Sequence, residues 1–169
     1  MSNNTTGAEA APRTQIQFDC VGTATGKMRN ELNVVMSRPS PDGPWELASD
    51  EGAFHGGDGS APPPLALFVA GLTGCIMTQM RAFAKRLSVS LDDLKVETRV
   101  VWDWQAAGRI YETAPHSFEI DILLTSSDDA SKVVELIEAA KKGCFLEQTL
   151  GTRNVIKHRL KTADGWLTV

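Results

Sequence analysis

The segment LALFVAGLTGCIMTQMRAFAKRL, residues 65–87, has the strongest structural signal in the chain. Its large apolar side chains recur every three or four residues, the spacing of a helix: Leu65, Phe68, Val69, Leu72, Ile76, Met80, Phe83 and Leu87. The first three turns carry no charge, and a helix that is apolar on every side must be enclosed on every side. Prolines at 62–64 mark its start. We therefore expect a buried central helix about 34 Å long, whose small residues let a second backbone, such as a partner's equivalent helix, approach closely.

After this helix, alternating polar and apolar residues predict a hairpin of two half-buried strands, residues 92–104 and 117–125, joined by a loop over 105–116. Ser127, Asp128 and Asp129 then provide capping side chains for a second helix over 130–143. Residues 154–160 and 166–169 are expected as closing strands.

Before the central helix, the patterns predict three strands: residues 15–22, 28–37 and 45–48. The segments 38–44 and 49–64 are rich in proline and glycine and are expected to be loops, and long loops of the second kind often carry function. The predicted order is β-β-β-α-β-β-α-β, which is typical of an α+β protein. We expect a disordered tail over 1–13 and a single domain over 14–169.

Composition argues against several classes of protein. The net charge is −4 and the pI is near 5.4, so a nucleic-acid or anionic membrane surface is not expected. No continuous apolar run in the sequence approaches the roughly 20 residues needed to cross a bilayer. A small organic molecule is the better expectation for a partner.

The three cysteines, Cys20, Cys75 and Cys144, are far apart in the sequence and form no CxxC pair. Their number and spacing suit neither a disulfide scaffold nor a zinc site, and they favour a reducing, cytoplasmic location. Cys20 alternates in phase with apolar neighbours and is predicted to lie in a strand core. We expect neither a metal nor a cofactor.

Several short motifs in a fixed order resemble the OsmC/Ohr family. They are Asp50-Glu51-Gly52, Gly56-Gly57 and Ala61-Pro62, the apolar helix with Gly74-Cys75, and Ala139-Ala140-Lys141-Lys142-Gly143-Cys144. The two cysteines are 69 positions apart, with the predicted hairpin between them. The resemblance covers about residues 15–161.

This resemblance implies an intertwined homodimer in which sheets wrap two central helices. It also implies reduction of organic hydroperoxides, with Cys75 as the peroxidatic thiol and Cys144 as the resolving thiol. Cys75 would form a sulfenic acid, Cys144 would close a disulfide, and an external dithiol would reduce it.

Such chemistry requires a thiolate, whereas an ordinary thiol is only about 3% ionised at pH 7. The helix dipole cannot supply the charge stabilisation, because Cys75 lies about ten residues inside the helix. A cation must therefore reach it, and the resemblance implies an arginine: Arg29 stands roughly where the Ohr branch keeps it, and Arg38, the second candidate, is nearer to its place in the OsmC branch. The family holds its arginine with a glutamate where this chain has Leu65, so another anion is needed here. The candidates are Glu51, Asp50 and Asp58. A second departure is Phe145, where the family usually has proline.

Two other functions remain open. A non-catalytic module could bind an acyl or aromatic ligand in an apolar pocket beside the central helix, a reading that Leu65 favours. A hot-dog type acyl-thioester hydrolase would need a carboxylate, Asn or Gln at the start of the helix, and residues 62–68 contain none.

Overall fold

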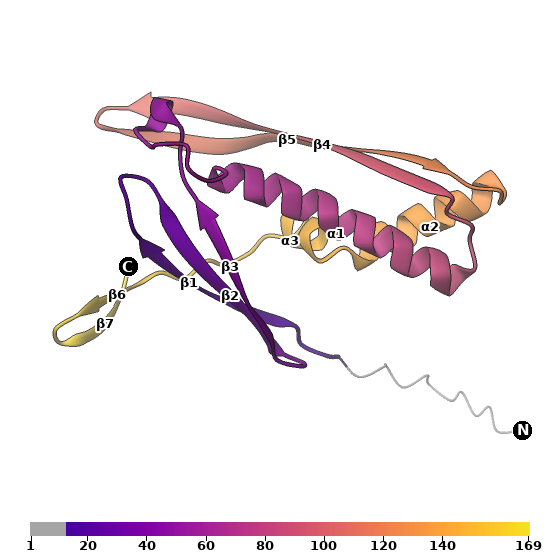
Figure 1. Ribbon diagram of the computed structural model, residues 1–169, viewed down its shortest axis with the longest axis horizontal. Helices are drawn as coiled ribbons and strands as arrows, with labels where there is room; N and C mark the ends of the chain where they lie inside the picture. Colours follow the sequence, from indigo (N-terminus) through magenta and orange to yellow (C-terminus); the bar gives the residue numbers. More distant parts are fainter. Residues whose placement is uncertain (1–12) are drawn as a thin grey trace, which may run out of the picture. The chain divides into compact units, whose positions relative to one another are not determined.

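The computed structural model describes residues 13–169 as a mixture of strands and helices (Figure 1). The elements are β1 (Gln17–Ala24), β2 (Asn30–Arg38), β3 (Asp42–Ser49), the 3₁₀ turn η1 (Ala53–His55), α1 (Pro64–Leu87), β4 (Asp93–Ala107), β5 (Ile110–Thr125), α2 (Ala130–Gly143), α3 (Phe145–Leu150), β6 (Arg159–Thr162) and β7 (Gly165–Thr168). The predicted α+β class is confirmed. The tail predicted over 1–13 lies, except for Arg13, outside the described residues.

The chain divides into two compact units, and the boundary between Leu67 and Phe68 falls in the first turn of α1. A single domain over 14–169 stays a prediction. Each unit is described by itself below.

The first unit contains an antiparallel sheet in the order β1-β2-β3. The third strand is longer than predicted, because Gly43 adopts a φ of 98° and lets the chain reverse so early that β3 already begins at Asp42. All residues of β1 are exposed, including Cys20. The predicted core position of Cys20 is therefore wrong. Alternation identifies the face on which a strand residue lies, but not whether the same chain covers that face.

In the second unit, β4 and β5 form a long antiparallel hairpin that extends from the pair Asp93–Thr125 to the pair Ala107–Ile110. The predicted loop over 105–116 is wrong, because both strands continue to a turn at Gly108 and Arg109. A register shift beside Trp102 brings that residue opposite Pro115. The shift accommodates a residue that has no N–H to donate to the ladder.

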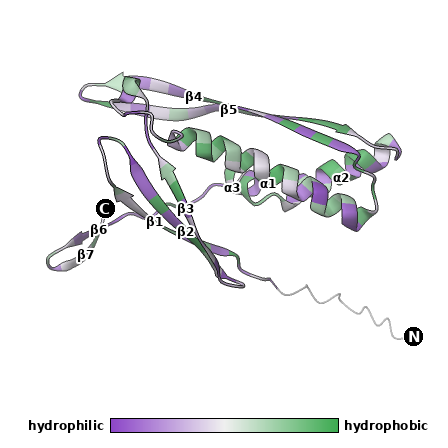
Figure 2. Ribbon diagram, viewed as in Figure 1, coloured by the Kyte–Doolittle hydropathy of each residue, from purple (hydrophilic) through white to green (hydrophobic). Residues whose placement is uncertain are grey.

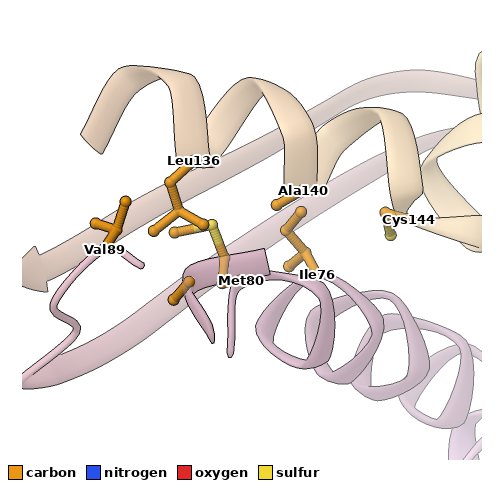
Figure 3. Packing of buried hydrophobic residues seen from close by; sticks show 7 residues of the cluster. Ile76, Met80, Val89, Leu136, Ala140 and Cys144 are labelled. Carbon is orange, nitrogen blue, oxygen red and sulfur yellow. The ribbon is translucent and has the colours of Figure 1, made fainter. Parts of the chain in front are cut away.

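The core of the second unit lies between α1, α2 and the hairpin. Buried residues recur every fourth position along α1, at Leu72, Ile76, Met80 and Ala84. Figure 3 shows Ile76 and Met80 facing Leu136, Ala140 and Cys144 from α2 and its C-terminal end. Partly buried residues of the hairpin complete this cluster, among them Val96, Ile120 and Ile122.

Burial along α1 is confined to this stripe, although apolar residues continue around its first half (Figure 2). Leu65, for example, is 54% exposed. Within the described residues the predicted enclosure on all sides is therefore incomplete. The partner helix of an intertwined dimer remains a prediction that would cover the other faces.

By length and composition, α1 could cross a membrane, since its most apolar window has a mean hydropathy of 1.4. The sequence predicts no such helix by the criterion of a continuous apolar run, because Thr73, Thr78 and Gln79 interrupt that run. The buried stripe of α1 packs against α2, and a core helix of this kind meets the same two criteria.

The C-terminal region contains one helix that the sequence analysis missed. The segment α3 has only six residues and follows α2 after a single residue, Cys144. A six-residue helix is too short to show a hydrophobic period. The closing strands β6 and β7 pair with each other. β6 overlaps the predicted strand 154–160 only at residues 159 and 160, whereas β7 has the predicted length and begins one residue earlier.

Candidate functional site

Two of the predicted site residues, Cys75 and Cys144, come together in the second unit. Cys75 lies on α1, half-buried and packed against the core cluster, and Cys144 is a fully buried member of that cluster. Both are free thiols, and the Cys144 thiol interacts with that of Cys75. The packing of α2 on α1 therefore brings together two cysteines that are 69 positions apart in the sequence.

Cys144 connects two helices. Its N–H donates to the carbonyl of Lys141 at the end of α2 (3.4 Å), and its carbonyl accepts the first hydrogen bond of α3 from the Gln148 N–H (2.9 Å). Cys144 thus stands at the N-cap position of α3, where its side chain makes no capping hydrogen bond and its backbone joins the two helices.

The glycine before Cys144 allows α2 to end close against α1. A Cβ atom at Gly143 would overlap the ring of Phe83 at Cε2 and lie 2.8 Å from its Cζ. A larger residue would push α2 away from α1 and move Cys144 with it. The role of Gly143 in this packing could not be predicted, because nothing in the sequence shows that it faces Phe83.

Burial raises the pKa of the Cys144 thiol to about 11 from an ordinary value of 9.0. The neighbouring Cys75 raises this pKa further, while the nearby backbone N–H groups of Glu147 and Leu146 lower it. Cys144 is therefore a neutral thiol at neutral pH.

This pKa predicts a loss of stability in alkali. A raised pKa in the folded state means that folding favours the neutral thiol, so the contribution is complete below about pH 9 and is lost as pH rises through about 11. A difference of about two units corresponds to roughly 2–3 kcal/mol at most. Urea unfolding of the reduced protein should show this extra decline relative to Cys144→Ala. Parallel pH profiles for the two proteins would contradict it.

A cavity of about 410 Å³ in the second unit is lined by sequence neighbours of the two cysteines, although neither cysteine is among its lining residues. Its wall is made mainly of isoleucine and phenylalanine, with two charged residues: Ile76, Phe118, Ile120, Ile122, Ile137, Lys141 and Glu147. Ile76 follows Cys75 on α1. Burial raises the pKa of Glu147, the charge of Glu138 raises it too, and Lys141 opposes both. The cavity is therefore suited to an apolar molecule.

In the first unit, Arg29 immediately precedes β2 and makes several polar contacts. Its Nε donates to Glu31 Oε1 at 2.7 Å, and its Nη1 donates to the Ser60 carbonyl oxygen at 3.1 Å and to Ser60 Oγ at 2.9 Å. The hydrogen bond to Glu31 raises the pKa of Arg29, and the charges of Glu31 and Asp50 add to it. Glu31 was not among the predicted residues.

Asp50 organises the loop that holds Ser60. Its side chain is 1% exposed, and it accepts hydrogen bonds from the Ser60 N–H (2.9 Å), the Ser60 hydroxyl (2.7 Å) and the Glu51 N–H (2.9 Å). The N–H and hydroxyl of Ser60 hold the pKa of Asp50 below its usual value, although burial opposes them. Asp50 is therefore a charged carboxylate that acts on Arg29 through Ser60.

The other predicted partners do not contact Arg29. Glu51 takes part through its backbone, whose carbonyl accepts the Gly59 N–H at 3.0 Å, so its predicted role as the anion that holds the arginine is not met. Asp58 pairs instead with Lys27 at 2.9 Å. Arg38, the second candidate cation, is exposed at the end of β2 and donates to Gln15. Among the described residues, no cluster of His, Cys, Asp and Glu is arranged to hold a metal ion.

Comparison with known proteins identifies one family. The model for the family described as OsmC-like protein matches residues 57–159. A crystal structure of an OsmC-like hydroperoxide resistance protein from Jannaschia sp. CCS1 is 60% identical, covers 93% of this chain and 100% of its own, and has a TM-score of 0.64. No curated protein sequence matches the chain.

Two more distant structures share the fold. An organic hydroperoxide resistance protein OsmC from Legionella pneumophila is 19% identical, covers 78% of this chain and 88% of its own, and has a TM-score of 0.56. An OsmC-like protein of unknown function from Vibrio cholerae is 13% identical, covers 81% and 95%, and has a TM-score of 0.60.

Proposed function

The chain belongs to the OsmC-like protein family, and from this premise we propose that it is a thiol-dependent reductase of organic hydroperoxides. The observation that carries the proposal is the packing of Cys75 against the buried core cluster that contains Cys144. The 60% identical protein from Jannaschia is named for hydroperoxide resistance, which supports the substrate class.

In the proposed reaction, the Cys75 thiolate attacks the terminal oxygen of the hydroperoxide. An S–O bond forms and the O–O bond breaks, so the sulfur is oxidised to a sulfenic acid and the peroxide is reduced to an alkoxide, which takes a proton to become an alcohol. Cys144 then attacks the Cys75 sulfur. The S–S bond forms, the S–O bond breaks, and hydroxide leaves with the proton of Cys144 as water.

An external dithiol completes the cycle. It reduces the disulfide through a mixed disulfide and is itself oxidised. Arg29 is the proposed cation that keeps Cys75 ionised. The intertwined homodimer and a cytoplasmic location, where thiols are kept reduced, belong to the same proposal. The apolar cavity lined by sequence neighbours of the cysteines favours a hydroperoxide with an apolar organic group over hydrogen peroxide.

The proposal is tested by the mass of the protein after one equivalent of tert-butyl hydroperoxide. The wild type should lose about 2 Da as the disulfide closes, Cys144→Ser should gain about 16 Da as sulfenic acid, and Cys75→Ser should stay unchanged. Peptide mapping should place the disulfide between Cys75 and Cys144. Oxidation of Cys75→Ser to the same extent as the wild type would overturn the proposal.

A second function, binding of an apolar ligand without catalysis, is favoured by the cavity lined with Ile120, Ile122 and Ile137. Native mass spectrometry with added decanoic acid tests it. A Phe118→Asp variant, which places a charge in the cavity wall, should abolish binding. Absence of a complex with the wild type would exclude this function for acyl chains.

A further inference from the structure

We propose that Glu31 and Ser60 are the positioning residues that fix the guanidinium of Arg29, with buried Asp50 holding Ser60. This inference rests on the proposed function, because it concerns the cation that the function assigns to Cys75. The residues that would orient this cation, Glu31, Ser60 and Asp50, all lie in the first unit.

The geometry fixes two of the three nitrogens of Arg29. Nε donates to Glu31 Oε1 at 2.7 Å, and Nη1 donates to both oxygens of Ser60, at 3.1 and 2.9 Å. Hydrogen bonds between two charged groups are stronger than neutral ones and restrict the planar guanidinium in orientation. Over residues 13–169 no hydrogen bond from Nη2 is found, so this nitrogen keeps its two donors for another anion.

The direction of each hydrogen bond explains the need for Asp50. A hydroxyl has one proton, and Ser60 Oγ donates it to Asp50 Oδ2 at 2.7 Å. The lone pairs of the same oxygen are then left to accept the Arg29 Nη1–H. The carboxylate of Asp50 is 1% exposed and compensated by hydrogen bonds from the loop. By accepting the hydroxyl proton, Asp50 therefore orients Ser60 Oγ as an acceptor for Arg29, although Asp50 itself makes no hydrogen bond to Arg29.

Exposure separates this pair from an ordinary surface ion pair. The side chains of Arg29 and Glu31 are 33% and 49% exposed, whereas those of Lys27 and Asp58, on the neighbouring turn and loop, are 70% and 64% exposed. Exposed pairs contribute little, because solvent screens them and the side chains move. Glu31 alone would hold Arg29 loosely, and the added contacts to Ser60 make the orientation specific.

The test measures how pH affects alkylation of Cys75 in the full-length reduced protein, with iodoacetamide as the probe and peptide mass spectrometry to resolve Cys75 from Cys20 and Cys144. Glu31→Ala should lower the alkylation rate at pH 7 about five- to tenfold and move the midpoint of the profile to higher pH. Ser60→Ala should act in the same direction and less strongly. Glu31→Asp should restore part of the rate, since it keeps the charge.

Asp58→Asn is the matched control, because it removes a carboxylate of the same loop that pairs with Lys27, and its profile should overlay that of the wild type. With tert-butyl hydroperoxide, Glu31→Ala should lower kcat/KM by the same factor as the alkylation rate. Glu31→Gln keeps the shape of the side chain and serves as the variant if Glu31→Ala fails to fold.

The Arg29→Ala variant distinguishes failure of the positioning role from failure of the proposed function. If Arg29→Ala moves the alkylation profile and neither Glu31→Ala nor Glu31→Gln does, the positioning role is wrong while the proposed function stands. If the Arg29 and Glu31 variants all leave the profile unchanged, Arg29 is not the cation for Cys75, and that part of the proposed function fails as well.

Discussion

Replacing Cys75 with serine should lower the steady-state rate of organic hydroperoxide reduction at least about a thousandfold. A serine hydroxyl does not ionise near neutral pH, and Cys144 cannot take over the first step, because it is fully buried and its pKa is raised to about 11. The measurement is peroxide consumption with dithiothreitol or a lipoyl dithiol as reductant.

Two further variants make this result specific. Cys144→Ser should allow one rapid oxidation of Cys75 and then slow turnover, because the disulfide that the dithiol reduces cannot form. Cys20→Ser is the matched control, since Cys20 is an exposed thiol on β1, and it should keep the wild-type rate. Equal rates for Cys75→Ser and the wild type would end the reductase proposal.

The second large effect is expected for Gly57→Ala, which should destabilise the first unit by about 2–4 kcal/mol. A Cβ atom at position 57 would overlap the carbonyl of Glu51 and lie 2.9 Å from Asp50 Oδ1. Because the obstacle is backbone, the loop itself must move, and the buried Asp50 carboxylate then loses hydrogen bonds that compensate its charge. Urea denaturation measures the change.

Gly52→Ala is the control from the same loop. Gly52 has an ordinary φ of −75°, and a Cβ there would meet nothing within 4 Å. It should therefore change the free energy of unfolding by less than about 1 kcal/mol. Gly57→Ala should also slow Cys75 alkylation, because the Ser60 contacts to Arg29 depend on the same loop. Similar stability of the two variants would show that the loop tolerates a side chain at position 57.

The helices and the cysteine pair could be predicted because their signals are local or regular. Prolines at 62–64 mark the start of α1, and the four-residue spacing of Leu72, Ile76, Met80 and Ala84 identifies its buried stripe. The bounds of α2 agree with the prediction, although Asp129 at its N-cap makes no side-chain capping hydrogen bond. The hairpin was underestimated because its outer half, beyond Trp102, is largely exposed and so shows no alternation.

The arrangement around Arg29 was only partly predictable. Glu31 is two positions after Arg29, a spacing that puts both side chains on one face of an extended chain, so this partner could have been found from the sequence. The hydrogen bond from Ser60 to Asp50 could not, because it depends on how a loop rich in glycine closes. Because Leu65 replaces the glutamate of the family, the prediction named carboxylates of the loop and did not include Glu31 on β2.

The proposed disulfide would couple the redox state of the protein to local mobility at Cys144. The carbonyl of this residue accepts the Gln148 N–H at 2.9 Å, and α3 has only six residues. A backbone shift that brings Cys144 to Cys75 would strain this hydrogen bond, and so short a helix has few others to hold its first turn. The oxidised form should therefore fray at this junction, where faster amide hydrogen exchange would mark it and where a reductant could gain access to the bond.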